Sequence, residues 1–239
     1  MRSYKKISIS DAHNLYKTKI TQLKMMKSRG YDITREKHLI SYNFQQFYNT
    51  YDNFCQKNKC SFRTVLSQVY TKKDGTKCGV YYADIPKKSS LGKDELCIFL
   101  NYLDEYKIKN GILITSKKLS PGAEKSRKGL VAYNIQIYLY NELLFDPTEH
   151  YMVPKHELLS PSEVSQLLMN NNINVNDMPL IKKTDTIVRY LGAKTGDIIR
   201  IHRINMINGI SMKNIVYRLV QKANTQNLSI SSGDEDNLL

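Results

Sequence analysis

The chain has 239 residues, of which 41% are apolar, enough for one large hydrophobic core or two modest ones. No stretch reaches about 18 consecutive apolar residues, and no apolar signal core follows the first residues, so we expect a soluble, non-secreted protein with no membrane-spanning helix. The four cysteines include no Cys-x-x-Cys pair and fit reduced thiols in the cytosol or nucleus.

The formal net charge of +14 is unevenly distributed along the chain. Residues 1–149 carry 26 Lys and Arg against 14 Asp and Glu, a net of +12, whereas residues 150–239 carry 10 against 8, a net of +2. The basic N-terminal part is therefore the part that would attract a polyanion, although a solvated, solubilising surface explains the charge excess equally well.

The N-terminal part begins with two predicted helices. Ser10-Asp11 is typical of a helix start, and Arg29-Gly30 of its end. A second helix should begin at Asn43, with an aromatic stripe at helical spacing that we assign to the core and not to base stacking. The apolar face of the first helix comprises Tyr16, Ile20, Leu23 and Met26, its exposed surface comprises Lys17, Lys19, Lys24 and Lys27, and the stripe of the second helix comprises Phe44, Phe47, Tyr48, Tyr51 and Phe54.

A mixed sheet should follow these helices. Segments 62–70 and 79–85 are rich in Val, Tyr and Thr and flank Asp74-Gly75, a strong hairpin signal. An amphipathic helix through residues 96–103 should end near Asn110-Gly111. Strands at 112–115 and 135–139 then enclose a basic helix that starts at Ser120-Pro121. This order predicts an α/β (α+β) fold, in which the first module is an open mixed sheet with flanking helices.

The last third has the signals of a smaller mixed α/β module. Ser160-Pro161 begins one helix, and Thr184-Asp185 begins a short one that Gly192 should end. Strands at 198–203 and 215–220 should form a hairpin with a longish loop containing Asn208-Gly209. With a linker at 146–149, we expect an N-terminal domain at 1–146, a C-terminal domain at 147–222 and a disordered acidic tail at 223–239.

Several spaced runs in this last third resemble the C-terminal module of the small subunit shared by the three eukaryotic nuclear RNA polymerases, a module that also has a counterpart in the archaeal RNA polymerase. They are His-x-x-Val-Pro-x-His-x-x-Leu (150–159), Pro-x-Ile-x-x-x-Asp (179–185), Arg-x-x-Gly-x-x-x-Gly-Asp (189–197), Arg203 and Tyr217-Arg218. The chain departs from the family pattern at Thr186, where the family usually has proline, and in the turn at 204–209, which is usually richer in Ser, Thr and Gly.

The basic helix start at 116–128 is the candidate nucleic-acid site. Free amides at a helix start, with lysines and arginine nearby, suit a phosphate backbone without reading its sequence, although an ordinary exposed basic helix has the same composition. The resemblance favours contact, because family members have a Ser/Thr-Pro-x-Ala segment in an N-terminal jaw module that lies along the downstream duplex. The candidate DNA-contact residues are Lys117, Lys118, Ser120, Pro121, Lys125, Arg127 and Lys128.

The resemblance also implies that the C-terminal module docks on the largest polymerase subunit. The candidate docking residues are Val153, Pro154, His156, Arg200, Arg203, Tyr217 and Arg218, of which His156 and Tyr217 could equally serve the module's own core.

Three other interpretations are weaker. Asp84 with Glu105-Tyr106-Lys107 has the residue types of a metal-dependent nuclease, but Glu105 and Lys107 are predicted at a helix end and not along a strand, so surface charge is the better interpretation. His150 and His156 could suggest zinc, but no further ligand lies at suitable spacing. A free-standing DNA-binding module is the third alternative.

The sequence therefore predicts a non-catalytic subunit of a multisubunit DNA-dependent RNA polymerase, without cofactor, metal or membrane contact. Its partners would be the largest subunit, the rest of the complex and downstream double-stranded DNA. We expect a nuclear location. The Asn-, Lys- and Ile-rich composition also fits an AT-rich large DNA virus, which would place the protein in the host cytoplasm (viral factory) and virion.

Overall fold

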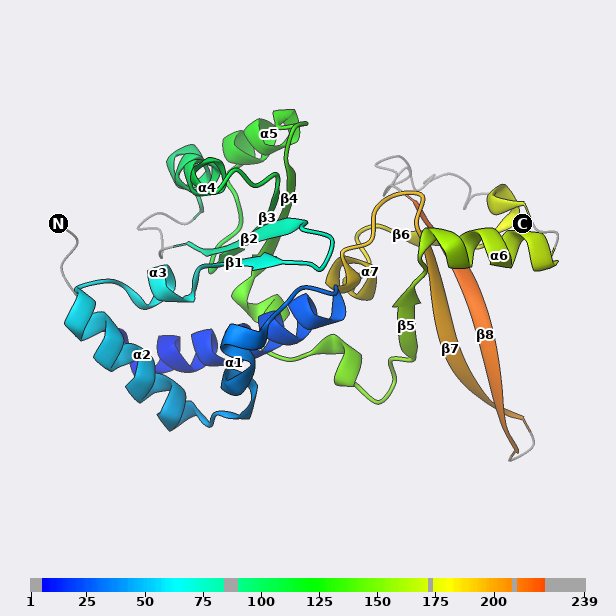
Figure 1. The fold of residues 1–239 in the computed structure, drawn as a ribbon, viewed down its shortest axis with the longest axis horizontal. Coiled ribbons are helices and arrows are strands. Elements are labelled where there is room, and N and C mark those ends of the chain that lie inside the picture. Colours follow the sequence, from blue (N-terminus) through cyan, green and yellow to red (C-terminus); the bar gives the residue numbers. More distant parts are fainter. Residues whose placement is uncertain (1–5, 84–89, 172–173, 208–209, 222–239) are drawn as a thin grey trace, which may run out of the picture. The chain divides into compact units, whose positions relative to one another are not determined.

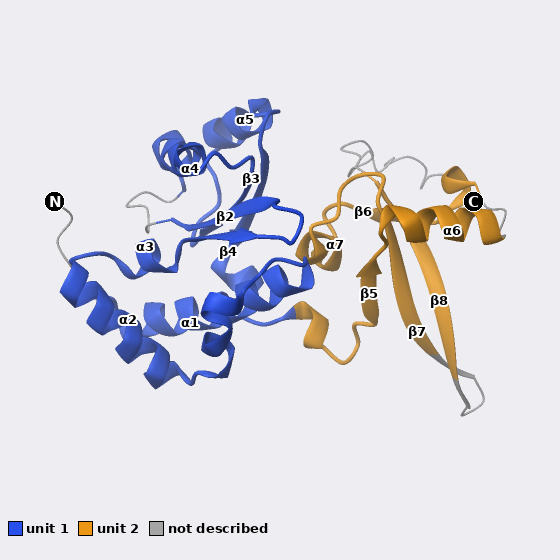
Figure 2. Cartoon of the chain, in the orientation of Figure 1, with its two compact units in different colours: residues 1–146 blue, residues 147–239 orange. Residues whose placement is uncertain are grey.

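The computed structural model describes residues 6–83, 90–171, 174–207 and 210–221. The chain divides into two compact units, residues 1–146 and residues 147–239 (Figure 2). Both combine helices with a mixed sheet, which confirms the expected fold class. The predicted tail at 223–239, the turn at Asn208-Gly209 and the nuclease candidate Asp84 lie outside the described residues.

Unit 1 is built on a four-stranded sheet with the order β1-β2-β3-β4. The strands are β1 Gln68–Thr71, β2 Lys77–Tyr82, β3 Asn110–Thr115 and β4 Asn134–Leu139. β1 and β2 form the predicted antiparallel hairpin, whose turn places Gly75 at a φ of 82°. β2, β3 and β4 are parallel, so two crossover helices connect them.

The crossover helices α4 (Lys93–Glu105) and α5 (Pro121–Gly129) lie on one face of this sheet (Figure 1). Leu96, Phe99 and Leu103 of α4 pack on that face with Leu113. The helix ends at Glu105, earlier than the expected Asn110-Gly111, because Asn110 already begins β3. Its last residues therefore give way to a turn at Lys107, with a φ of 55°.

Two glycines bring α4 close to the sheet. Gly79 of β2 and Gly111 of β3 are opposite each other in the parallel register. A Cβ atom at Gly79 would lie 2.8 Å from Leu103 Cδ2, and one at Gly111 would lie 2.6 Å from Phe99 Cζ. The absence of both side chains allows the helix to pack directly on the strand backbones.

The opposite face of the sheet is covered by the N-terminal helices (Figure 1). These are α1 Ile9–Ser28, the 3₁₀ helix η1 Thr34–Ser41, α2 Phe44–Asn58 and α3 Phe62–Leu66, and a short 3₁₀ helix η2 Tyr140–Leu143 follows β4. The first helix starts two residues before the predicted Ser10-Asp11, because the side chain of Ser8 accepts from the Asp11 amide. Residues 62–66, predicted as strand, are helical because Ser61 caps them by accepting from the Thr64 amide.

The aromatic stripe of α2 is only partly core. Phe47 and Tyr51 are buried as expected, and Phe44 and Tyr48 are half-buried. Phe54 is 50% exposed, so the last residue of the predicted stripe does not belong to the core. The second helix begins as predicted, with a capping box in which Asn43 and Gln46 exchange hydrogen bonds.

Lys19 was expected on the surface of the first helix, and this expectation is wrong. Its side chain is fully buried, and Nζ lies 2.9 Å from Glu36 Oε1, 3.1 Å from the Leu66 carbonyl oxygen and 3.0 Å from the Tyr70 hydroxyl. Burial lowers the pKa of Lys19, and Glu36 opposes that shift. The helix is covered on several sides, so its hydrophobic stripe does not mark all of its buried surface.

Unit 2 contains a four-stranded sheet with the order β5-β7-β8-β6. The strands are β5 Lys155–Leu158, β6 Leu180–Lys182, β7 Ile198–Ile207 and β8 Ile210–Gln221. The helices are α6 Pro161–Asn171 and α7 Thr186–Leu191, with short 3₁₀ turns η3 Pro147–Glu149 and η4 Val175–Asp177. β7 and β8 form a ladder from Ile198 to Ile207, so the hairpin is longer than predicted and its loop is shorter.

Each face of this sheet has its own helix. Ile199 and Ile201 pack with Ile187 and Val188 of α7 on one face, and Ile198 packs with Leu167 of α6 on the other. The caps are those the sequence predicts: Asp185 accepts from the amides of Ile187 and Val188, and Gly192 ends α7 at a φ of 73°. Ser160 and Glu163 exchange hydrogen bonds at the start of α6.

Candidate docking and nucleic-acid surfaces

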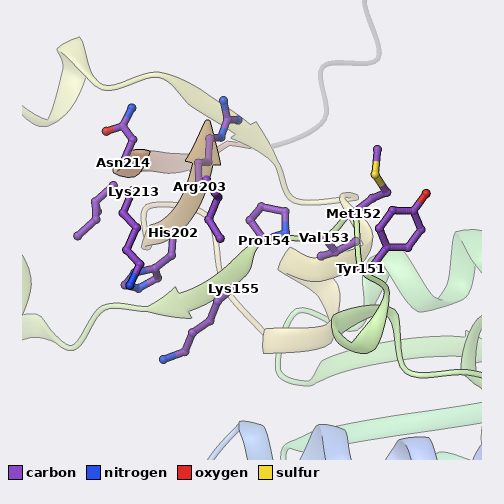
Figure 3. A pocket seen from close by; sticks show the side chains of 11 residues that line it. Tyr151, Met152, Val153, Pro154, Lys155, His202, Arg203, Lys213 and Asn214 are labelled. Atoms are coloured by element: carbon purple, nitrogen blue, oxygen red, sulfur yellow. The ribbon is translucent and has the colours of Figure 1, made fainter. Parts of the chain in front are cut away.

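A groove of about 800 Å³ lies in unit 2 where β5 begins beside the β7–β8 hairpin (Figure 3). Its walls come from the segment that leads into β5, from β7 and from β8. The lining residues are Tyr151, Met152, Val153, Pro154, Lys155, His202, Arg203, Ile204, Lys213, Asn214 and Ile215. The groove therefore combines large apolar side chains with three permanent cations and contains no carboxylate among its lining residues.

The apolar side chains of this groove are unusually open to solvent. Tyr151 is 89% exposed, Met152 68% and Ile204 67%. Adjacent exposed apolar side chains of this size are a mark of a contact surface. Arg203 and Lys213 are also exposed, and neither forms an ion pair with another residue that the structure describes.

The groove brings together three of the predicted docking residues, Val153, Pro154 and Arg203. It adds residues that the sequence reasoning missed, chiefly Tyr151, Met152, Ile204, Lys213 and Ile215. A signal was present at Tyr151-Met152, where two large apolar residues precede Val-Pro outside any periodic pattern. Ile204 and Lys213 lie on parts of β7 and β8 that the sequence did not predict as strand, because both predicted strands were too short.

Arg200 and Tyr217 lie elsewhere, on the face of the sheet that carries α6. They are opposite each other in the ladder, with the Arg200 guanidinium 6.0 Å from the centre of the Tyr217 ring. Arg200 Nη1 also lies 3.4 Å from Glu157 and 3.4 Å from Glu163. Arg200 therefore ties α6 to the sheet, and the predicted docking residues do not form one continuous surface.

Two further candidates also make contacts inside unit 2. His156 Nδ1 lies 2.6 Å from the Pro154 carbonyl oxygen, and Arg218 Nη1 donates to the Leu180 carbonyl oxygen at 3.0 Å. His156 is half-buried, as expected for a histidine that helps to hold its own segment.

A second charged cluster lies beside the groove. Glu157 accepts from Lys155 at 2.6 Å and lies 2.8 Å from His202 Nε2. Hydrogen bonds from Lys155 and then from His202 lower the pKa of Glu157 to about 2. The Glu163 pKa is lowered by the Ser160 amide and hydroxyl. Both carboxylates stay ionised at neutral pH. Glu157 joins β5 to Arg200 and His202 of β7, and Glu163 joins α6 to Arg200.

The predicted DNA-contact residues surround the start of α5 in unit 1. Lys118, Lys125 and Lys128 are exposed, and Lys117 is half-buried. Arg127 Nε donates to Glu124 at 3.0 Å, and this hydrogen bond lowers the Glu124 pKa. The three exposed lysines are therefore the cations that can turn toward a phosphate backbone, whereas the charge of Arg127 is partly neutralised.

The helix start offers fewer amides than the sequence suggests. Ser120 Oγ accepts from the Ala123 amide at 3.3 Å, and the Ser120 amide donates to the Leu91 carbonyl oxygen. Pro121 has no N–H group. Of the first positions, only the Gly122 amide remains for an anion, so Ser120 and Pro121 shape the helix start and the lysines supply the charge.

The structure also bears on the enzymatic alternatives. Glu105 is the last residue of α4 and Lys107 lies in the turn after it, so neither lies along a strand. No group of three or more His, Cys, Asp or Glu side chains suited to a metal ion occurs in the described parts of the chain. His150 Nδ1 accepts from the Met152 amide at 3.2 Å. In the same described parts, no helix is long and apolar enough to cross a membrane.

Comparison with known proteins gives a family match, to the C-terminal domain of RNA polymerase Rpb5, over residues 145–220. This range spans the fold of unit 2 almost entirely and includes the groove.

Individual relatives extend the similarity into unit 1. The chain is 24% identical to subunit RPABC1 of DNA-directed RNA polymerases I, II and III from Caenorhabditis briggsae, over 88% of this chain and 97% of that protein. It is 23% identical to the Caenorhabditis elegans protein of the same name over the same shares, and 23% identical to DNA-directed RNA polymerase V subunit 5A of Arabidopsis thaliana over 92% of this chain and 94% of that protein. Unit 2 therefore matches the Rpb5 C-terminal domain family, and the chain is similar along most of its length to subunits of RNA polymerases.

Proposed function

We propose that the chain is an assembly and DNA-contact subunit of a multisubunit DNA-dependent RNA polymerase and performs no reaction of its own. In this proposal unit 2 docks on the largest subunit, and the basic face of unit 1 contacts the downstream duplex. The protein would act in the nucleus, as part of a hetero-oligomer. The sequence similarity to shared polymerase subunits along nearly the whole chain supports this role.

The single observation that carries the docking assignment is the groove of unit 2. Exposed Tyr151, Met152 and Ile204 lie next to Arg203 and Lys213, so burial of apolar surface and charge attraction would act on the same partner. Arg200, in contrast, is occupied by Glu157 and Glu163 within unit 2. We therefore assign docking to the groove residues, and assign Arg200 and Tyr217, which do not line the groove, to internal support.

Co-purification with a tagged largest subunit tests the docking assignment. Met152→Asp places a charge in the groove and should reduce recovery of the chain at least about tenfold, because a buried unpaired carboxylate is costly at an interface. Met169→Asp is the matched control, since Met169 is 81% exposed on α6 and lies outside the groove.

Two double variants with the same change in net charge show whether docking depends on the charges of the groove or on the total charge of unit 2. Arg203→Glu with Lys213→Glu should release the chain from the complex, whereas Lys183→Glu with Lys194→Glu, which changes two exposed lysines of the same unit by the same total charge, should not. Equal recovery of both double variants would refute docking through the groove.

A further inference from the structure

The C-terminal end of α2 in unit 1 brings two cysteines together. The helix ends at Asn58, and Lys59 follows in the left-handed conformation, with a φ of 51° and a ψ of 40°. The Cys60 amide then donates back to the Cys55 carbonyl oxygen at 3.2 Å. In this type of helix end, the left-handed residue reverses the chain, and the residue after it packs against a residue in the last turn of the helix. Cys60 and Cys55 occupy these two positions.

The separation of the two cysteines suits a disulfide. Their Cα atoms are linked through one carbonyl group, one hydrogen bond and one N–Cα bond, so they lie no more than roughly 7 Å apart. A disulfide spans about 4.4–6.8 Å between Cα atoms. A hydrogen bond also joins the two thiols, so the sulfur atoms face each other. A covalent bond between them therefore requires little movement of the backbone.

The two thiols differ in their access to solvent. Cys55 is fully buried, whereas Cys60 is half-buried. Burial raises the pKa of the Cys55 thiol to about 12, and the charge and hydrogen bond of Cys60 add to this rise. A cysteine attacks another sulfur as its thiolate, and only where the reagent can reach it. Cys60 is therefore suited to attack first, with Cys55 placed behind it to complete the bond.

We propose that Cys55 and Cys60 form a reversible disulfide by exchange with a small disulfide such as oxidised glutathione. The Cys60 thiolate attacks one sulfur of the reagent, the S–S bond of the reagent breaks, and one reduced glutathione leaves. The Cys55 sulfur then attacks the Cys60 sulfur of this mixed disulfide and releases the second glutathione. Two electrons pass from the cysteines to the reagent, and the two thiol protons end on the two glutathione molecules.

The disulfide would fix the junction between α2 and α3. Ser61, next to Cys60, caps α3 by accepting from the Thr64 amide. At the other end of α3, the Leu66 carbonyl oxygen accepts from the buried Lys19 amine at 3.1 Å. A covalent bond across the turn at Lys59 would oppose fraying of α2 and hold the start of α3 in place. Because thiols in the nucleus and cytosol are kept reduced, this bond would form under oxidising conditions and be reduced again afterwards.

Peptide mapping of the native full chain tests the proposal. The protein is equilibrated with mixtures of oxidised and reduced glutathione, its free thiols are blocked with iodoacetamide, and it is digested with trypsin. Cleavage after Lys57 and Lys59 places Cys55 and Cys60 on separate peptides, so a disulfide appears as one linked pair. We expect this linked pair to be the main disulfide product and to disappear when reduced glutathione is in excess.

Three variants locate the bond. Cys60→Ser should abolish the linked pair, whereas Cys97→Ser, which removes an exposed cysteine of α4, should leave it unchanged. Lys59→Val should shift the equilibrium toward the free thiols by roughly fivefold, because a β-branched residue disfavours the left-handed turn that brings the thiols together.

Two outcomes overturn the proposal. One is a native protein in which Cys60 keeps glutathione as a stable mixed disulfide, or stays free for iodoacetamide, at every ratio of the two glutathione forms. The other is a linked pair that forms only after unfolding in urea, since the folded turn would then not bring the thiols together. The test uses the free chain and does not depend on polymerase assembly.

Discussion

The proposed contact between unit 1 and duplex DNA makes a quantitative prediction about the salt dependence of binding. Lys118, Lys125 and Lys128 are exposed around the start of α5, whereas Arg127 is bound to Glu124. Each lysine that neutralises one phosphate contributes about −0.9 to the slope of log K against log salt concentration. Reversing all three to glutamate should therefore make the slope shallower by up to about 2.7.

This change of slope corresponds to a large difference in affinity. Between 50 and 200 mM salt, three phosphate contacts account for roughly a 40-fold loss of binding, because a fourfold rise in salt is raised to the power of about 2.7. Fluorescence anisotropy of a labelled 30-base-pair duplex, measured with the full chain at several salt concentrations, gives both values. The wild-type chain should show the steep dependence, and the triple variant should lose most of it.

The control for this experiment has the same change in net charge at another place in unit 1. Lys17 and Lys27 of α1 and Lys57 of α2 are exposed on helices that cover the opposite face of the sheet. Their replacement by glutamate should leave most of the slope intact. If both triple variants flatten the slope equally, the chain attracts DNA through its overall charge, and the assignment to the α5 surface is wrong.

Three further outcomes follow from packing and charge. Lys19→Met should lower the free energy of unfolding by roughly 3–5 kcal/mol, since it leaves Glu36 without its buried partner, and adding Glu36→Gln should recover part of the loss in a urea titration. Gly111→Ala should cost about 1–3 kcal/mol by overpacking, whereas Gly129→Ala, whose Cβ meets nothing within 4 Å, should stay within about 0.5 kcal/mol; thermal unfolding compares them. Because the pKa of Glu157 is lowered to about 2, its contribution to stability is present above its ordinary pKa and is lost as the pH falls toward 2, so Glu157→Gln should lose less stability between pH 5 and pH 3 than the wild type.

Local signals in the sequence predicted those elements whose ends are set by neighbouring residues. The capping box at Asn43, the cap at Asp185 and the left-handed Gly192 are short-range features, and the structure has each of them. The hairpin at Asp74-Gly75 is of the same kind. The failure at 62–66 also has a local cause, because the helix cap at Ser61 outweighed the strand preference of the residues that follow it.

Properties that depend on distant residues were not predictable in this way. Lys19 is buried because Glu36, Leu66 and Tyr70 meet at its amine, and no spacing in the sequence indicates that meeting. The site was predictable only in part for the same reason. The resemblance predicted Val153 and Arg203, which line the groove. It also predicted Arg200, which does not line the groove and, three residues before Arg203 on β7, points to the other face of the sheet.

The paired glycines at positions 79 and 111 also set limits on how unit 1 can vary. Neither residue has a side chain, so the distance between α4 and the sheet at this point is set by the backbones of β2 and β3. α5 packs beside α4, and the exposed lysines around its start move with it. A methyl group added at either glycine would push α4 away from the sheet, and α5 with the exposed lysines around its start would shift with α4. Two uncharged residues therefore help to set the position of these lysines.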